Sequence, residues 1–167
     1  MEKSRKVVMK TYKFRLYPSE QVEQKMFDTL ELSRQTYNIL LGELQEQKVI
    51  DKAQIQGIIP DMKICDSRFK KLYSKTMQYE CYRLFSNLRA LAQTKKQGRN
   101  VGSLRFKGKG WFKTFTYNQS GFKLIGTGKR NNTLRLSKIG DIKIRCHRQL
   151  ISWVSKLFPL LCEIVER

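Results

Sequence analysis

The chain has 167 residues, 40% of them hydrophobic, and a formal net charge of +20 at pH 7. A chain of this length buries a real core and folds as one or two small domains. No apolar run approaches the roughly 20 residues that a membrane-spanning helix needs, and the charged start of the chain does not resemble a secretory signal. We therefore expect a cytoplasmic protein with no membrane partner.

The positive charge is concentrated in the second half of the chain. Between Arg99 and Arg148 the only acid is Asp141, while lysines, arginines and aromatic residues follow one another closely. A cationic surface attracts polyanions, and aromatic rings among the cations favour a nucleic acid over a small anionic substrate. We expect binding that weakens with increasing salt, because each neutralised phosphate releases counterions.

The cysteines do not form a metal-binding pattern. Cys65, Cys81, Cys146 and Cys162 are widely spaced, and His147 is the single histidine. Zinc sites need closely spaced cysteine and histidine ligands. The sequence therefore predicts no metal and no cofactor, and it places Cys81 and Cys146 in the core as small apolar side chains.

The first regular element is expected to be a strand within residues 9–18. Phe14 and Leu16 alternate with Lys13 and Arg15, which is the period of a strand with one buried face and one cationic face. A single strand cannot be stable alone, so it needs partners from elsewhere in the chain.

Helical periodicity follows the first strand. Apolar residues recur at intervals of three and four over residues 20–48 and again over 68–97, which predicts two long amphipathic helices. Ser19 is placed to cap the first of them. The segment between the two helices is expected to be short and broken by Gly57 and Pro60.

Short β-rich runs separated by glycines begin after Gly98. Strands are predicted over 113–117, 121–125, 133–136 and 141–146. In the last of these, Ile142 and Ile144 alternate with Lys143 and Arg145, so that strand also has an apolar and a cationic face. Pairing the N-terminal strand with this region gives an α+β fold, in which the helices are inserted into a small barrel or sheet.

The last segment, residues 149–167, is dense in apolar side chains and contains Pro159. Two interpretations are open for it. It forms a short kinked amphipathic helix that packs on the β region, or it is an unanchored tail that is prone to aggregation.

Three strings occur in order along the chain: TYKFRLYP at 11–18, LRFKGK at 104–109 followed by FTY at 115–117, and RLSKIGDIKIRCHR at 135–148. Together they resemble the N-terminal half of the TnpB (OrfB) proteins of insertion sequences, which are relatives of the type V CRISPR effectors. The resemblance implies a wedge-type β-barrel with an inserted helical recognition bundle. It also implies an RNA-guided DNA nuclease family, whose guide RNA and target duplex lie along these two parts.

The chain departs from the family pattern after Arg148, where the apolar segment replaces the end of the barrel. The family's RuvC-like nuclease domain, with its acidic triad, is expected to be missing, and so we expect no enzymatic activity. The expected organisation is a first barrel strand at 9–18, a helical recognition bundle at 19–98, the remaining barrel strands at 99–148 and a divergent apolar tail at 149–167. We interpret the chain as a truncated reading frame.

Three polar residues are candidates for reading a target-adjacent DNA motif. The resemblance assigns this role to Ser74 and Gln78, four apart on the second long helix, and to Thr116 in the barrel. Gln bonds an adenine edge in a bidentate manner, and Ser bonds several base edges. Lys71 and Lys75 lie beside them in the sequence. The alternative is an ordinary solvated helix face.

A second group of candidates is cationic. These residues are expected to contact phosphates of RNA or DNA without reading sequence, and the alternative is a set of solvated loops and strand faces. The group comprises Lys13, Arg15, Arg105, Lys107, Lys109, Lys113, Lys143 and Arg145. Phe106, Trp111 and Phe112 either stack on bases or belong to the core.

The most specific prediction is a nucleic-acid-binding recognition fragment of a TnpB-like protein, linked to DNA transposition. Its partners would be a guide-like RNA and double-stranded DNA, and it would be associated with the nucleoid when bound. The alternatives are a stand-alone DNA- or RNA-binding regulator and a decayed remnant without activity.

Overall fold

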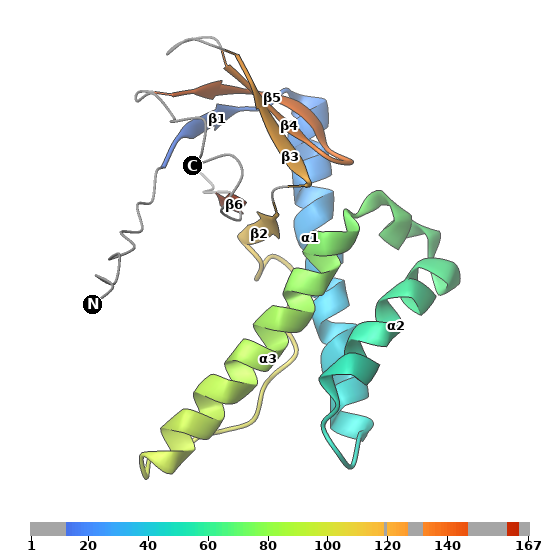
Figure 1. Ribbon diagram of the computed structural model, residues 1–167, viewed down its shortest axis with the longest axis vertical. Coiled ribbons are helices and arrows are strands. Elements are labelled where there is room, and N and C mark those ends of the chain that lie inside the picture. Colours follow the sequence, from blue (N-terminus) through green and yellow to red (C-terminus); the bar gives the residue numbers. More distant parts are fainter. Residues whose placement is uncertain (1–12, 119, 127–131, 147–159, 164–167) are drawn as a thin grey trace, which may run out of the picture.

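A computed structural model of the chain describes residues 13–118, 120–126, 132–146 and 160–163, the last of these as backbone. Within these residues the fold is a mixture of three helices and two antiparallel sheets (Figure 1). The elements are β1 (Arg15–Tyr17), α1 (Glu20–Glu46), α2 (Lys52–Cys65), the 3₁₀ helix η1 (Ser67–Lys71), α3 (Ser74–Lys96), β2 (Thr114–Tyr117), β3 (Phe122–Ile125), β4 (Asn132–Leu136), β5 (Gly140–Arg145) and β6 (Leu160–Glu163).

The larger sheet joins the two ends of the fold. Its strand order is β1-β5-β4-β3, and Leu16 of β1 pairs with Ile144 of β5. The prediction that the first strand pairs with the later β region is confirmed, and the helices lie between these strands in the sequence. The edge strands β1 and β3 are not paired with each other, so this sheet is open and the expected closed barrel is not confirmed.

The smaller sheet corrects the interpretation of the tail. Residues 160–163 form β6, which pairs with β2 in antiparallel register, with Cys162 opposite Phe115. Neither a helix nor an unanchored segment describes these four residues. An edge strand such as β2 presents unpaired backbone groups, and an apolar extended segment satisfies them. Residues 149–159 and 164–167 of the tail lie outside the described residues.

The helices differ from the prediction at their ends. The Ser19 backbone is extended and its carbonyl accepts a bond from the Glu23 amide at 2.8 Å, but its side chain makes no capping bond. The second long helix begins at Ser74 and not at residue 68, because Leu72 and Tyr73 have extended backbones after η1.

Helix α2 also differs from the prediction, since it runs continuously through Pro60. Proline in a helix interior removes one backbone hydrogen bond and disfavours the helix by about 3 kcal/mol. Burial of Ile55, Ile59 and Met62 against the rest of the core offsets this cost.

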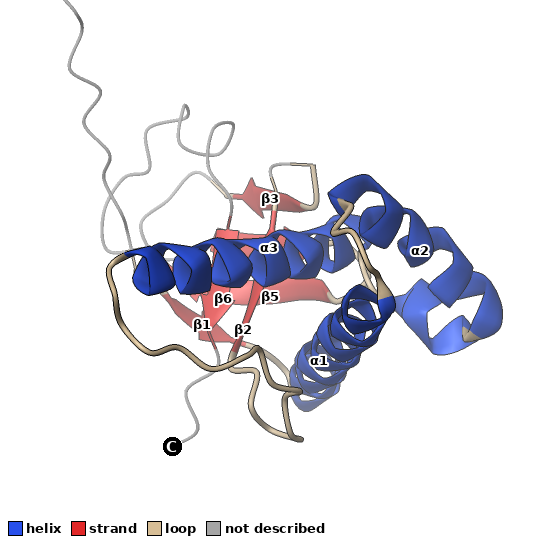
Figure 2. Cartoon of the chain, turned by 90° about the horizontal axis from the view of Figure 1, so that it is seen from below, coloured by secondary structure: helices blue, strands red, loops and turns tan. Residues whose placement is uncertain are grey.

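One hydrophobic core links the helices to the sheet. Met77, Cys81 and Leu84 on α3 are completely buried, as their spacing predicted, and Ile142 on β5 is buried from the sheet side. Figure 2 shows α3 crossing over the strands, with α1 beside them. None of the helices in the described ranges is long and apolar enough to cross a membrane.

Candidate nucleic-acid interface

The exposed side of the larger sheet is cationic. On β5, Ile142 and Ile144 point into the core, which leaves Lys143 and Arg145 exposed on the opposite side. Arg15 of β1 lies directly opposite Arg145, and Tyr17 lies directly opposite Lys143. Residues directly opposite one another in an antiparallel pair share a face. We call this surface the sheet face; it comprises Arg15, Lys143, Arg145, Lys123 and Arg135.

One cation of the sheet face is already neutralised. Arg135 donates two hydrogen bonds to the Asp141 carboxylate, at 2.7 and 2.8 Å, and these bonds lower the pKa of Asp141. Arg15 lies over the Tyr17 ring at 5.5 Å from its centroid. The cross-strand pair of Arg15 with Arg145 places like charges together, which is unfavourable unless an anion lies over both.

Lys13, the remaining cation predicted near the first strand, is exposed immediately before β1. Lys13, Arg15 and Tyr17 are exposed, whereas Phe14 and Leu16 are half-buried, so the predicted alternation of faces is confirmed over the described part of this strand.

The motif-reading candidates of α3 lie at its first turns. Ser74 is the first residue of the helix, and its hydroxyl accepts a bond from the Lys63 ammonium. Lys75 donates to the Gln78 side-chain oxygen at 3.1 Å. Lys71 belongs to η1 and not to this helix, which corrects its predicted position on α3.

Thr116 of β2 lies beside Thr76, near the start of α3. The Thr76 hydroxyl donates to the Thr116 carbonyl at 3.0 Å, and further along α3 the Arg83 guanidinium reaches the Thr114 hydroxyl at 3.3 Å. Ser74 and Gln78 each lie two positions from Thr76, so they are on the side of α3 that faces away from β2. The structure therefore brings Thr116 to α3 but does not place it on one face with Ser74 and Gln78.

Tyr73 stabilises the junction between the start of α3 and β2. Its ring stacks on Tyr117 with centroids 5.0 Å apart, and its hydroxyl donates to the Asn118 side chain at 2.7 Å. A Cβ atom on Gly121 would lie 2.4 Å from the Tyr73 ring, so only glycine fits there. Periodicity does not identify this contact, because Tyr73 lies in the extended segment between two helices.

The predicted cations of the second string lie on a loop that is fixed to α1. The Asn38 side chain accepts from the Lys107 amide at 2.8 Å and donates to the Lys107 carbonyl at 3.0 Å. Arg34 donates to the same carbonyl at 2.7 Å, and Glu31 in turn holds Arg34. We call residues 105–113 the anchored loop. Asn38 and Arg34 are functional candidates that the sequence did not indicate.

The anchored loop exposes most of its charged and aromatic side chains. Arg105, Lys109 and Lys113 are exposed, and Lys107 is half-buried with its ammonium 4.9 Å from the centroid of the Trp111 ring.

The aromatic residues of this loop divide into two kinds. Phe106 and Trp111 are 56% and 66% exposed, whereas Phe112 is 7% exposed and packs edge-on against Tyr37. Phe112 is therefore a core residue. Of the two interpretations left open for it, base stacking and core packing, the structure supports core packing.

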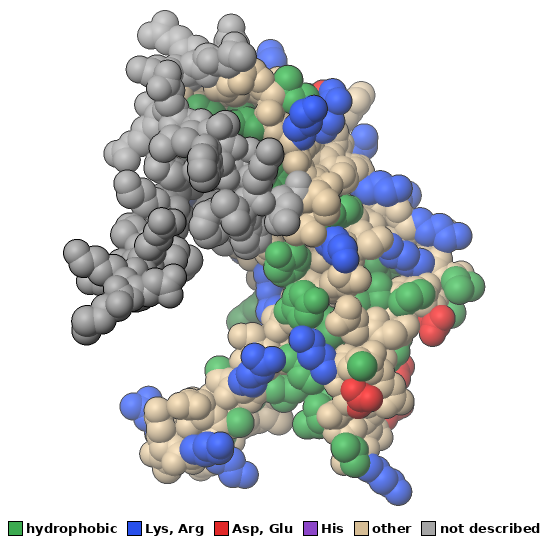
Figure 3. Space-filling view, in the orientation of Figure 1, with side chains coloured by type: hydrophobic (Ala, Val, Ile, Leu, Met, Phe, Trp, Pro, Cys, Tyr) green, Lys and Arg blue, Asp and Glu red, His purple; other side chains and the backbone are tan. Residues whose placement is uncertain are grey.

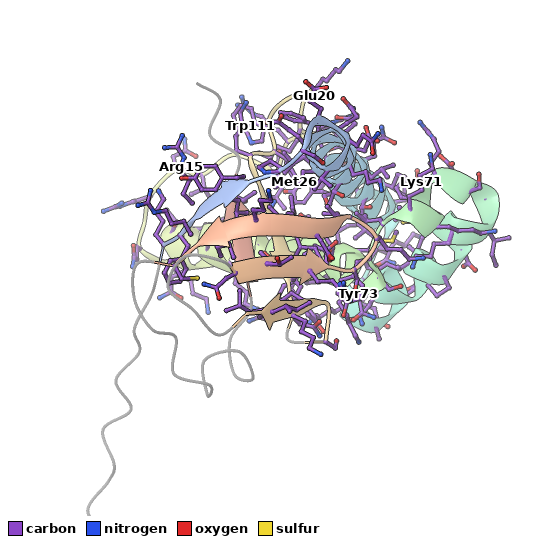
Figure 4. The ribbon with its side chains drawn as sticks, turned by 90° about the horizontal axis from the view of Figure 1, so that it is seen from above. Arg15, Glu20, Met26, Lys71, Tyr73 and Trp111 are labelled. Atoms are coloured by element: carbon purple, nitrogen blue, oxygen red, sulfur yellow. The ribbon has the colours of Figure 1, made fainter. Side chains whose placement is uncertain are left out.

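The candidates are spread over different sides of the molecule. In the view of Figure 4, Lys71 lies far from Arg15 and Trp111, on the opposite side of the strands. Figure 3 shows that lysine and arginine side chains are widespread on one face of the protein, whereas acidic side chains are few there. Among the described residues, these candidates therefore do not all lie on one surface.

Comparison with known families adds an independent observation. Residues 8–48 match the family model of the OrfB/IS605 helix-turn-helix domain. This N-terminal part of the chain is thus similar to a helix-turn-helix domain of the OrfB/IS605 family. This domain indicates DNA binding in a transposon-associated protein. A comparison with curated proteins gave no match.

The matched segment has an unexpected form in the structure. Its described part consists of β1 and the single continuous helix α1, and the next helix begins only at Lys52. The matched segment therefore supplies one strand of the sheet face and the helix that anchors residues 105–113.

Proposed function

We propose that this chain is the nucleic-acid-binding part of a TnpB-like insertion-sequence protein, which binds a guide-like RNA and double-stranded DNA and does not itself cleave. The observation that carries the proposal is the sheet face, where Arg15 and Arg145 lie side by side on strands from the two ends of the fold. The match of residues 8–48 to a domain of transposon-associated proteins supports the DNA part of the proposal.

The two surfaces suit different parts of such a complex. Lys143, Arg145 and Arg15 form a flat cationic strip, which is the arrangement that follows a phosphate backbone. Ser74 and Gln78 offer neutral donors and acceptors on one side of α3, which suits base edges. Thr116 offers a further hydroxyl on β2. In this proposal the sheets are the wedge-type barrel that the resemblance implies, and the helices are its recognition bundle.

Motif reading is tested by a binding panel. The purified chain is titrated with duplexes that differ in a short randomised motif, and the selected motif is then compared for wild type, Gln78→Ala and Gln93→Ala. Gln93 lies exposed near the end of the same helix and serves as the matched control. We expect Gln78→Ala to relax the preference at one position, with a loss of about 1–3 kcal/mol in discrimination. An unchanged preference contradicts the assignment.

The RNA partner is tested by recovery. RNA that copurifies with the chain is extracted and sequenced, and enrichment of one element-derived RNA supports the proposal. The helix-turn-helix match favours one second candidate, a stand-alone DNA-binding regulator. Specific duplex binding without any enriched RNA supports that second candidate.

A further inference from the structure

The anchored loop combines exposed aromatic rings with cations. Trp111 is 66% exposed and Phe106 is 56% exposed. Arg105, Lys107 and Lys109 are interleaved with these rings in the sequence. Aromatic rings and cations in this alternation bind unpaired nucleic acid strands, since every base has a flat face that stacks and every linkage carries a phosphate.

The anchored loop is held in place before any ligand binds. Both backbone groups of Lys107 are bonded to Asn38, and Arg34 adds a third bond to the same residue. The Lys107 ammonium then lies against the Trp111 ring. A pre-ordered loop loses little conformational entropy on binding, which makes it a better binding surface than a flexible one.

An open-sided cavity of about 370 Å³ lies between this loop and α1. It is lined by Gln24, Asp28 and Glu31 from the helix and by Lys109 and Lys113 from the loop, among others. Its volume falls in the range of small-ligand sites, and it is large enough for a single base.

The charges in the cavity set the orientation of a nucleotide. Bonds from Arg34 lower the pKa of Glu31 to about 2, so this carboxylate is ionised at neutral pH. Both Glu31 oxygens already accept bonds from Arg34 or Gln35, and one Asp28 oxygen accepts from Gln24. The phosphate is therefore favoured on the loop side of the cavity, beside the exposed Lys109, and away from Asp28 on the helix side.

We infer that the anchored loop and this cavity form a site for an unpaired nucleic acid strand, in which one base stacks on Trp111 and a neighbouring base enters the cavity. This inference rests on the proposed function and adds the class of ligand for this surface. A base in a duplex is stacked on both faces and paired along one edge. It can therefore neither stack on the Trp111 ring nor enter the cavity. The sheet face remains the surface for the backbone of a duplex.

The test is fluorescence anisotropy with labelled oligothymidine, oligouridine and a blunt-ended duplex. Trp111→Ala is compared with wild type, with Trp111→Phe and with Tyr82→Ala. Tyr82 is the matched control, because it is also exposed and lies under a lysine, Lys52, at 4.4 Å, but belongs to α3 and not to the anchored loop. Circular dichroism checks that each variant is folded.

We expect Trp111→Ala to weaken binding of the single strands on the order of tenfold and to leave duplex binding within about twofold of wild type. Trp111→Phe should retain most of the affinity, and Tyr82→Ala should change nothing. Tighter binding of oligouridine than of oligothymidine identifies the strand as RNA, and the reverse identifies it as DNA.

Two results overturn the inference in different ways. Equal effects of Trp111→Ala on single strands and duplex, or no effect on either, show that no unpaired base stacks on this ring while the proposed function stands. If the wild-type chain binds neither the single strands nor the duplex, both the inference and the proposed function are refuted.

Discussion

Arg15 and Arg145 lie directly opposite each other in the register of β1 and β5, and both are exposed. The sheet joins these strands through the core pair of Leu16 and Ile144, which stabilises the pairing from the other face. The like charges on the outer face are therefore tolerated by the fold and are available to a polyanion.

The first prediction concerns the stability of the free protein. Arg15→Gln removes one charge from the cross-strand pair, and we expect the free energy of unfolding to rise by about 0.2–1 kcal/mol. Urea denaturation at low salt measures this change. Lys123→Gln on β3 is the matched control, because its cross-strand partner Arg135 is already neutralised by Asp141. A loss of stability specific to Arg15→Gln contradicts the account of the pair.

The second prediction concerns the junction of α3 and β2. Gly121→Ala places a methyl group 2.4 Å from the Tyr73 ring, so the ring must move away from Tyr117. We expect destabilisation by about 1–3 kcal/mol, the usual cost of overpacking. Gly108→Ala has open space around its added methyl group and is the control. Equal denaturation midpoints for both variants contradict the packing described for Tyr73.

The third prediction concerns the anchored loop. Asn38→Ala removes both side-chain bonds to the Lys107 backbone, and we expect a destabilisation of about 1–2 kcal/mol. The Lys107 amide should also exchange with solvent faster than in the wild type, because its acceptor is gone. Hydrogen exchange followed by NMR measures this directly. Unchanged protection of this amide is incompatible with the bond described.

The fourth prediction concerns Glu80, which is buried on α3. Burial raises the pKa of its carboxyl to about 8, and the charge of Arg83, 3.2 Å away, offsets only part of this shift. The folded protein therefore holds a proton that the unfolded chain, with a pKa near the ordinary 4.5, has lost. Stability should fall as the pH rises from about 4.5 to about 8.

Glu80→Gln tests this directly, since the amide keeps the shape of the acid and cannot ionise. The variant should lack this part of the pH dependence and should be more stable than the wild type at pH 8 and above. Denaturation curves over this pH range provide the comparison. Parallel pH profiles for the two proteins would show that Glu80 is already ionised in the folded state.

The sequence predicted the parts of the structure that depend on periodic burial. Lys143 and Arg145 were placed on one face because alternation leaves no other choice once Ile142 and Ile144 are buried. The stripe of Met77, Cys81 and Leu84 followed from helical spacing in the same way. Such patterns repeat along the chain, so they are visible without the structure.

The parts that the sequence did not reveal are single contacts between distant residues. Asn38 and Lys107 are 69 positions apart, and nothing in either neighbourhood marks the bond. The helix predicted over 68–97 begins only at Ser74, after the extended residues Leu72 and Tyr73. This segment contains no glycine or proline, so no local signal marks the interruption. Pro60, in contrast, signalled a break that tertiary packing overrides.

The central claim is that the sheet face binds the phosphate backbone, and a salt titration tests it most directly. The affinity for a duplex is measured over a range of salt concentrations for wild type and for the double variant Lys143→Gln, Arg145→Gln. We predict weaker binding by the variant, with a slope of log affinity against log salt that is smaller by about 1.8, or 0.9 for each lost phosphate contact. An unchanged affinity and slope in the folded variant would contradict the claim.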